Sequence, residues 1–366
     1  MKWKQQIHGM KAYLPGKPIE EVKREFGLQE VIKLASNENP FGCSPKVTAY
    51  LKDDATNHAI YPDGYAQSLR TAVATHLDVK ETQLLFGNGS DDIITIITRA
   101  LLYPGVNTVM ADPSFSQYSH NAAIEGAEIR KIPTIEGAHD LDAMAKAIDD
   151  ETSVVWVCSP NNPTGVIIPD TELRAFFDKV PPEVLIVLDE AYVEYVTHPG
   201  HKPTLSLIEE YPNVLLMRTF SKAYGLASFR VGYAIGQAEL IAKLEPVRAP
   251  FNNTNLSQAV AAIALHDQAY IQSCREANEQ GKKQFVAFCE KHNLTNYPSD
   301  TNFVFFDTAA DSDVVFNELM KRGFIIRSGA ALGAPGFIRV TIGTEAQNAA
   351  FLAQLEEVLC ELGVIA

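Results

Sequence analysis

The sequence predicts an α/β protein in two parts, a large domain with a mainly parallel seven-stranded sheet and a smaller α+β domain. Three observations lead to this prediction. The chain has 366 residues, which is beyond the size at which one hydrophobic core usually stops growing. Short apolar runs alternate with helix-length segments from about residue 84 to residue 236. After Pro250 the pattern changes to a long helical stretch followed by a second set of strand-like runs.

Seven apolar runs form the predicted sheet of the large domain. They are hydrophobic on both faces, and helix-length segments separate most of them. The runs are LLF at Leu84, TVMA at Thr108, EIRKI at Glu128, SVVWVC at Ser153, LIVLD at Leu185, VLLMRT at Val214 and VGYAIG at Val231. Such runs are typical of a parallel sheet that is covered by helices.

The C-terminal part begins with a predicted connecting helix from about Leu256 to His292, a stretch with helical periodicity and no proline. Beyond it, the strand-like runs NFVFFD at Asn302, FIIR at Phe324 and FIRVTI at Phe337 alternate with helical segments. We therefore expect an N-terminal arm with part of the small domain at 1–44, a large domain at 45–255, and the connecting helix with the small domain at 256–366.

Composition excludes several classes of function. The formal net charge is −14 and no basic face is apparent, which disfavours a nucleic-acid partner. No apolar run approaches membrane-spanning length, and the start of the chain has no secretory signal pattern, so we expect a cytoplasmic protein with no membrane partner. The 5 cysteines include no C-x-x-C pair and the histidines no H-E-x-x-H, so we expect no metal site.

Polar residues gather where the predicted strands end. In open α/β sheets, ligands bind outside the carboxyl ends of the strands. Five of the runs are followed there by GNGSDD, DPSFSQY, SPNNPTG, DEAYVEY and TFSK. The chemistry of this protein is therefore expected at that edge of the sheet.

Lys222 is the strongest single candidate. It ends the segment Thr219-Phe220-Ser221-Lys222, and Arg230 follows it. A lysine at a strand end, beside two hydroxyls and an arginine, is suited to hold an aldehyde cofactor covalently while its neighbours bind a phosphate. Taken alone, however, a lysine is more often a solvated surface residue.

Asp189 strengthens that interpretation, because it places a carboxylate at the end of the apolar strand LIVLD. A buried aspartate needs a partner, and a protonated pyridine nitrogen is one that keeps the ring electron-withdrawing. Tyr192 and the Asn162 side chain, the latter in a rigid Pro/Gly turn, are candidate donors to the 3′ oxygen of such a ring. Alternatively, they are an ordinary semi-buried tyrosine and an ordinary turn.

Two further motifs fit the same cofactor. Gly89, Ser90 and Asp91 precede an apolar helix, and a helix N-terminus binds phosphate through its free N–H groups. Simple helix capping explains this motif equally well. Phe115, at the next strand end, is placed to stack on a pyridine ring, although a core aromatic would look the same.

These motifs, in this order, resemble those of fold-type I pyridoxal-phosphate aminotransferases, and in detail those of the histidinol-phosphate aminotransferase family. The resemblance extends over nearly the whole chain. Its further motifs are N-E-N-P at 37–40, Y-P-D at 61–63, N-N-P-T-G at 161–165, D-E-A-Y at 189–192, F-S-K-A-Y-G-L-A from Phe220, and R-V-T-I-G at 339–343.

The resemblance implies roles for the cofactor-binding residues. Lys222 would hold pyridoxal 5′-phosphate as a Schiff base, Asp189 would pair with the ring nitrogen, and Tyr192 and Asn162 would donate to the 3′ oxygen. Phe115 would stack on the ring. The remaining residues would bind the phosphate: Gly89, Ser90, Asp91, Thr219, Ser221, Arg230 and, from the neighbouring subunit, Tyr61, which makes a homodimer part of the expectation.

For the substrate, the resemblance assigns Arg339 to an anionic group, and Arg327, Tyr13 and Asn39 to further substrate contacts. Arginine binds such groups as a planar fork. Surface ion pairing is the alternative for Arg327. The chain departs from its relatives at Ser228, where many have glycine, and this leaves the local loop shape open.

The expected reaction is the transfer of an amino group from L-histidinol phosphate to 2-oxoglutarate, in histidine biosynthesis. An aromatic amino acid aminotransferase and a threonine-phosphate decarboxylase remain alternatives, because their sequence patterns are close. A regulator built on the same fold is disfavoured, because the motifs run from about residue 37 to residue 343 and leave no room for a DNA-binding domain.

Overall fold

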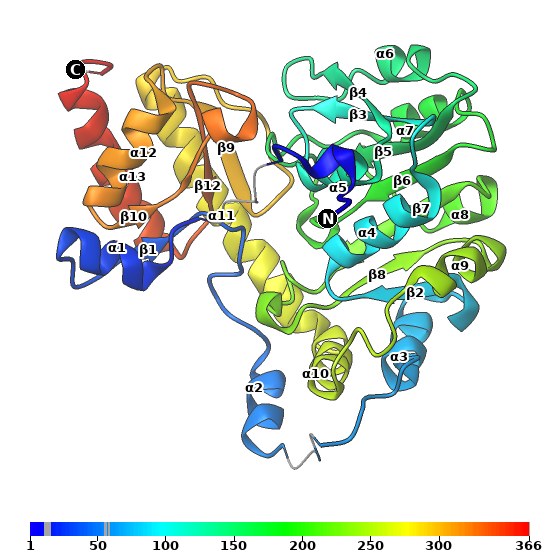
Figure 1. Ribbon diagram of the computed structural model, residues 1–366. Coiled ribbons are helices and arrows are strands. Elements are labelled where there is room, and N and C mark those ends of the chain that lie inside the picture. The colour runs from blue at the N-terminus through cyan, green and yellow to red at the C-terminus, as the bar shows by residue number, and fades with distance from the viewer. Residues whose placement is uncertain (11–15, 55–56, 58, 366) are drawn as a thin grey trace.

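The computed structural model describes residues 1–10, 16–54, 57 and 59–365. Two bodies lie side by side in it, and the long helix α11 (Gln268–His292) runs between them (Figure 1). The larger body carries the middle of the chain, and the smaller one carries its C-terminal part together with a segment from near the N-terminus. None of the helices among the described residues is long and apolar enough to cross a bilayer.

The larger body is built on a seven-stranded sheet with the strand order β2-β8-β7-β6-β5-β3-β4. Its strands are β2 (Leu84–Gly87), β3 (Asn107–Asp112), β4 (Glu128–Pro133), β5 (Thr152–Cys158), β6 (Leu185–Asp189), β7 (Val214–Thr219) and β8 (Gly232–Ile235). Only β8 runs antiparallel to its neighbours. The prediction of a mainly parallel sheet from seven runs is confirmed. The edge strand β4 is an exception to the expected two-sided burial, because three of its six residues are exposed.

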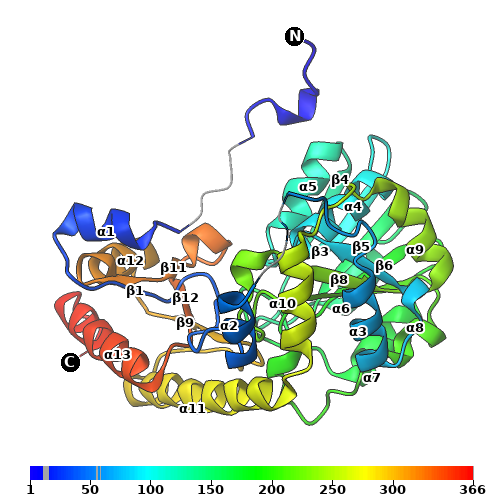
Figure 2. The ribbon, with the colours of Figure 1, turned by 90° about the horizontal axis from the view of Figure 1, so that it is seen from below.

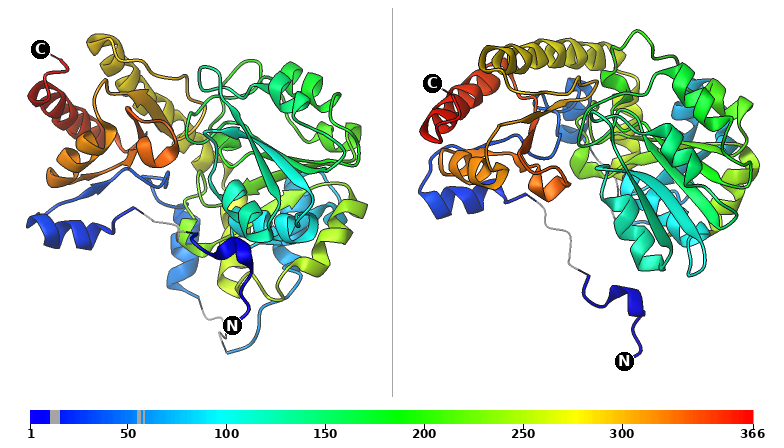
Figure 3. Two further views of the ribbon diagram at one scale, coloured as in Figure 1. Left: turned by 45° about the horizontal axis from the view of Figure 1, so that its top comes forward. Right: turned by 90° about the horizontal axis from the view of Figure 1, so that it is seen from above.

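Helices cover both faces of this sheet (Figure 3). One face packs against α3 (Gln67–Leu77), α6 (Leu141–Lys146), α7 (Asp170–Phe177), α8 (Ser206–Glu210) and α10 (Asn255–Leu265), with α2 (Pro45–Lys52) beside them. The other face packs against α4 (Ser90–Leu101), α5 (Gln117–Glu125) and α9 (Ala238–Leu244). Each face thus has its own apolar core, and the layered arrangement leaves the strand ends free to present polar side chains.

The predicted connecting helix is in fact two helices, α10 and α11, which separate at His266 and Asp267. Asp267 has non-helical angles, φ −100° and ψ 59°. Its carboxylate accepts hydrogen bonds from the hydroxyl of Ser44 and, at 3.1 Å, from the ammonium of Lys46. These contacts with the start of α2 favour a break that the helical periodicity did not indicate, because they hold the Asp267 side chain toward α2.

The smaller body has an antiparallel sheet in the order β11-β12-β9, formed by Arg327–Ser328, Phe337–Thr341 and Phe303–Asp307. The helices α12 (Ser312–Lys321) and α13 (Glu345–Glu361) pack on its apolar core. The run FIIR is split, because β10 (Phe324–Ile325) leaves this sheet and pairs in parallel with β1 (Ile32–Lys33). The helix α1 (Ile19–Phe26) precedes β1 on this body.

The N-terminal residues lie on the larger body, away from α1 (Figure 2). There the short helix η1 (Gln5–Ile7) contacts α5, and the Lys4 ammonium pairs with the Glu125 carboxylate at 2.8 Å. The chain also has short 3-10 helices at η2 (Glu81–Gln83), η3 (Val193–Tyr195), η4 (Ala227–Phe229), η5 (Glu245–Val247) and η6 (Ala330–Leu332). The residue limits of the domains stay a prediction.

Candidate active site

The carboxyl ends of β5, β6 and β7 bring the predicted site residues together. Asn162 follows β5, Asp189 ends β6, and Lys222 follows β7. Because these three strands are parallel neighbours, their following loops meet at one edge of the sheet. The N-terminal segment at 35–37 reaches the same edge from the smaller body through hydrogen bonds to Arg339, Lys222 and Tyr192.

Lys222 lies at the centre of this group. Its ammonium donates to the carbonyl oxygen of Ser36 at 3.1 Å and lies 5.9 Å from the centre of the Tyr192 ring. Burial, and then the positive charge of Arg339, lower the pKa of Lys222 to about 8. Much of this amine is therefore neutral at a mildly alkaline pH, as a nucleophile or a base requires.

Asp189 is buried, with 4% of its surface exposed. Burial raises the pKa of its carboxyl to about 6, although hydrogen bonds from the Tyr118 hydroxyl at 2.5 Å and from the Ala191 backbone N–H at 3.1 Å oppose the rise. Two donors do not compensate fully for the lost hydration of the carboxylate. A cationic group beside it would restore the ionised form.

Tyr118, the aromatic residue that contacts the Asp189 carboxylate, packs against two further aromatic side chains. The ring of Tyr118 stacks on Trp156 with centroids 4.7 Å apart, and Phe115 meets Tyr118 edge to face at 5.6 Å. Phe115 is only partly buried. A flat ring above Asp189 would find in Phe115 an aromatic side chain that the core has not fully enclosed.

The residues predicted to bind a phosphate lie together at the start of α4, and we call this cluster the cradle: Gly89, Ser90, Asp91, Thr219, Ser221 and Arg230. No side chain caps this helix, so its first N–H groups are not satisfied by a capping residue. The Arg230 guanidinium lies 3.3 Å from the Ser221 hydroxyl and 3.4 Å from the Asp91 carboxylate. Gly89 has φ 80° and ψ 172°, a backbone conformation that residues with a side chain rarely adopt, so glycine is favoured where Arg230 crosses the helix start.

Arg339 joins the two bodies at the site. Its guanidinium donates to the Asn162 side-chain oxygen at 2.5 Å and to the Ala35 carbonyl at 2.8 Å. Because the Asn162 oxygen accepts from Arg339, the amide nitrogen of Asn162 is the group left to donate elsewhere. The predicted ring donor and the predicted substrate arginine are therefore in direct contact, which the sequence did not indicate.

Arg327 stands directly opposite Arg339 in the antiparallel pair of β11 and β12. Opposed residues in such a pair project from the same face of a sheet, and two like charges there repel. An anion with more than one charge would relieve that repulsion. The two arginines thus stand opposite each other across the strands, and Arg339 contacts Asn162.

The other predicted residues are distributed differently. Tyr61 is 79% exposed and stacks on Phe251 at 4.9 Å, away from the Lys222 group. Asn39 is anchored next to Lys222, since its amide donates to the Ala223 carbonyl at 2.8 Å and to the Cys274 sulfur at 3.4 Å. Tyr13 falls outside the described residues. Ser228 is exposed, and the loop around it still folds back, with Arg230 donating to the Ala227 carbonyl at 3.1 Å.

Comparison with known proteins agrees with this geometry. Residues 29–355 match the family model "Aminotransferase class I and II". The chain is 80% identical over 366 residues to the histidinol-phosphate aminotransferase of Lysinibacillus sphaericus, with full coverage of both chains, and 56% identical over 348 residues to that of Geobacillus thermodenitrificans, covering 95% of each. The chain therefore belongs to the histidinol-phosphate aminotransferase family. Among solved structures, the Sinorhizobium meliloti histidinol-phosphate aminotransferase in complex with pyridoxal 5′-phosphate superposes with a TM-score of 0.89 at 28% identity, covering 99% of this chain and 98% of that one.

The site of this family member fits pyridoxal 5′-phosphate. The uncapped start of α4 with Arg230 suits a phosphate, and the buried carboxyl of Asp189 suits a protonated ring nitrogen. Lys222, with its lowered pKa, suits the aldehyde. The predictions of a fold-type I fold, a pyridoxal-phosphate-dependent aminotransferase and small-molecule substrates are confirmed.

Sequence analysis missed three contributors to the site of this aminotransferase. Tyr118 binds Asp189, Asn37 binds the Tyr192 hydroxyl at 3.0 Å, and the carbonyls at 35 and 36 bind Arg339 and Lys222. The motif N-E-N-P pointed to this segment, where Asn37 contacts Tyr192 in addition to the predicted Asn39, whose substrate role stays a prediction. Backbone acceptors leave no mark on the sequence, so only the structure reveals them.

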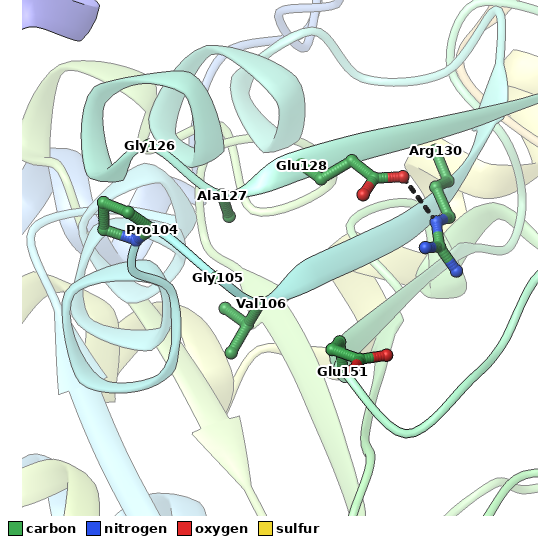
Figure 4. Close-up of a pocket in the computed structure, with 8 residues that line it drawn as sticks. All are labelled: Pro104, Gly105, Val106, Gly126, Ala127, Glu128, Arg130 and Glu151. Atoms are coloured by element: carbon green, nitrogen blue, oxygen red, sulfur yellow. Dashed lines mark hydrogen bonds and ion pairs between the residues drawn. The ribbon is translucent and has the colours of Figure 1, made fainter.

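A surface pocket elsewhere is unrelated to this site (Figure 4). It is lined by Pro104, Gly105, Val106, Gly126, Ala127, Glu128, Arg130 and Glu151. These residues lie at or near the amino ends of β3, β4 and β5, the opposite edge from the Lys222 group. Among the described residues, no cluster of histidine, cysteine or acidic side chains has the arrangement of a metal site.

Proposed function

We propose that this enzyme transfers the amino group of L-histidinol phosphate to 2-oxoglutarate, giving imidazole acetol phosphate and L-glutamate, a step of histidine biosynthesis. The observation that carries the proposal is that Arg327 stands opposite Arg339 in the sheet, with Arg339 in contact with Asn162. A phosphate ester and a dicarboxylate each bring the negative charge that two neighbouring guanidinium groups favour. The names of the relatives support the same substrate.

The proposed roles follow from the contacts of each side chain. When bound, pyridoxal 5′-phosphate supplies an aldehyde that captures the amine and a ring that takes up electrons released at the substrate Cα. Lys222 holds the aldehyde and, once displaced by the substrate, accepts and returns the Cα proton, for which a pKa of about 8 is suited. Asp189, ionised, keeps the ring nitrogen protonated. The cradle around Arg230 binds the phosphate, and Phe115 stacks on the ring.

Asn162 and Arg339 then link the cofactor to the substrate. With its oxygen bound to Arg339, the Asn162 amide nitrogen is free to donate to the 3′ oxygen of the ring. Arg339 and Arg327 hold the anionic group of the amine or of the 2-oxo acid, with Tyr13 and Asn39 as the further predicted contacts. Substrate and ring are thereby held in one fixed geometry, which is a main source of rate acceleration.

We further propose that the enzyme acts as a homodimer with shared active sites. Exposed apolar side chains gather around Tyr61, namely Ile60 at 63%, Tyr65 at 68% and Phe251 at 45% exposure. Such a patch is typical of an interface between subunits, which supports the proposal that Tyr61 reaches the phosphate of a partner's cofactor. A cytoplasmic location fits the cysteines, all five of which are free thiols.

The test is an assay of purified enzyme with histidinol phosphate, phenylalanine or threonine phosphate, each with and without 2-oxoglutarate. We expect glutamate formation to be fastest with histidinol phosphate. Faster turnover of phenylalanine would favour an aromatic aminotransferase, and release of carbon dioxide from threonine phosphate would favour a decarboxylase. Light scattering of the eluted protein, together with the cofactor dissociation constant of Tyr61→Phe, tests the dimer: a monomer with unchanged cofactor affinity would contradict it.

A further inference from the structure

Asn37 occupies an unusual position. It is buried, with 1% of its surface exposed, and its backbone has φ 56°, in the left-handed region. Asparagine and glycine tolerate this conformation best among the amino acids, so the backbone alone explains a choice between those two. The side chain favours asparagine over glycine at this position, because glycine could not make the side-chain hydrogen bonds described below.

The two ends of the Asn37 side-chain amide bind different bodies. Its oxygen binds Thr341, in the sheet of the smaller body, and its nitrogen binds Tyr192, in the larger body. The backbone N–H of Asn37 donates to the Thr341 hydroxyl oxygen at 2.9 Å, and that hydroxyl donates to the Asn37 side-chain oxygen at 3.0 Å. The amide nitrogen then donates to the Tyr192 hydroxyl at 3.0 Å. Asn302 anchors the backbone, with its amide donating to the Asn37 carbonyl at 2.9 Å.

These hydrogen bonds fix the orientation of the Asn37 side-chain amide. Since the Thr341 hydroxyl gives its proton to the Asn37 oxygen, the amide is oriented with its nitrogen toward Tyr192. A phenol oxygen that accepts a hydrogen bond keeps its own proton for another acceptor. In the described part of the chain, the Tyr192 hydroxyl makes no other hydrogen bond with the protein. Burial raises the pKa of this phenol well above its usual value, which keeps the proton on the oxygen.

We propose that Asn37, oriented by Thr341, is a positioning residue that holds the Tyr192 hydroxyl as a donor to the 3′ oxygen of the cofactor. This inference rests on the role of Tyr192 in the proposed function and adds the group that enforces it. The strap formed by residues 35–37 then connects the smaller body to the chemistry of the larger one, because the same strap also binds Arg339 and Lys222 through its carbonyls.

The experiment measures the pH midpoint of the visible absorbance of the holoenzyme, which reports loss of the proton on the nitrogen that joins Lys222 to the cofactor. A weaker donor to the 3′ oxygen leaves more negative charge beside that proton, so the midpoint rises. We expect Tyr192→Phe to raise it by about one pH unit, and Asn37→Gly and Thr341→Val by roughly half a unit each. Thr341→Ser, which keeps the hydroxyl, should restore the wild-type midpoint.

A double-mutant cycle separates positioning from a general structural effect. In the Tyr192→Phe background, Asn37→Gly should cause no further shift, because Asn37 acts through the missing hydroxyl. An equal shift in both backgrounds would overturn the proposal, as would a wild-type midpoint in both Asn37→Gly and Thr341→Val. A holoenzyme whose midpoint does not respond to Tyr192→Phe would instead refute the underlying role of Tyr192, and the proposal for Asn37 with it.

Discussion

The two sides of the active site are built in different ways. On the cofactor side, Asn162, Asp189 and Lys222 lie on loops after adjacent parallel strands of one sheet, and each loop is held by its own strand. On the substrate side, Arg339 meets the Ala35 carbonyl through a hydrogen bond that spans 304 positions of the chain. One sheet therefore positions all three residues on the cofactor side, whereas the substrate side forms only when the two bodies are in contact.

This difference predicts that substitutions on the cofactor side abolish the chemistry, and that substitutions on the substrate side weaken binding while the cofactor stays bound. Lys222→Ala should have the largest effect, lowering turnover by about 1,000-fold or more because it removes both the covalent link and the base. The measurement is turnover, together with borohydride trapping of the cofactor. An adduct that persists in Lys222→Ala would refute the assignment, and the matched control Lys282→Ala should keep the adduct.

Asp189→Asn should follow, with a loss of about 100-fold in turnover. The substitution preserves shape and removes the charge that keeps the ring nitrogen protonated, so electron withdrawal by the ring weakens. Steady-state kinetics and the cofactor dissociation constant measure both consequences. Turnover within twofold of the wild-type value would show that the ring nitrogen has another partner.

Arg339→Lys tests the substrate side. A lysine keeps the charge but loses the planar fork, so we expect KM for histidinol phosphate and 2-oxoglutarate to rise by about tenfold to 100-fold. The visible absorbance of the bound cofactor should remain. Arg322→Lys is the matched control, because Arg322 pairs with Glu361 on the outer surface of the same body. Loss of the cofactor from Arg339→Lys would place this residue on the cofactor side.

Tyr118→Phe should have the smallest effect, and one that depends on pH. The hydrogen bond from Tyr118 lowers the pKa of Asp189, which burial otherwise raises to about 6, so its removal raises that pKa further. The ionised carboxylate is lost as pH falls, and in the variant it is lost at a higher pH. Cofactor affinity should therefore drop by about tenfold near pH 6 and hardly change above pH 8.

The control for this prediction is Tyr233→Phe, a substitution of another buried tyrosine that packs against the opposite face of the sheet. It should leave the pH dependence of cofactor affinity unchanged. If cofactor affinity falls at the same acidic pH in Tyr118→Phe and in the wild type, Tyr118 has no influence on the ionisation of Asp189.

The sequence by itself determined the cofactor side. Apolar runs predict strands, parallel strands predict that the following loops meet, and the residues in those loops carry recognisable chemistry, as Lys222 and Asp189 do. The prediction of one continuous helix from 256 to 292 was wrong at Asp267. The side chain of Asp267 binds Ser44 and Lys46, which are distant in sequence. Local periodicity contains no information about such a contact.

Only the tertiary structure decided the substrate side. The orientation of Asn37 depends on Thr341, the reach of Arg339 depends on the carbonyl of Ala35, and the opposition of Arg327 and Arg339 depends on the register of β11 and β12. Sequence analysis named both arginines and Asn39 but not Asn37, whose contacts with Tyr192 and Thr341 only the structure reveals. Each of these features is set by the docking of chain segments far apart in sequence, whereas a strand and the loop that follows it are encoded by neighbouring residues.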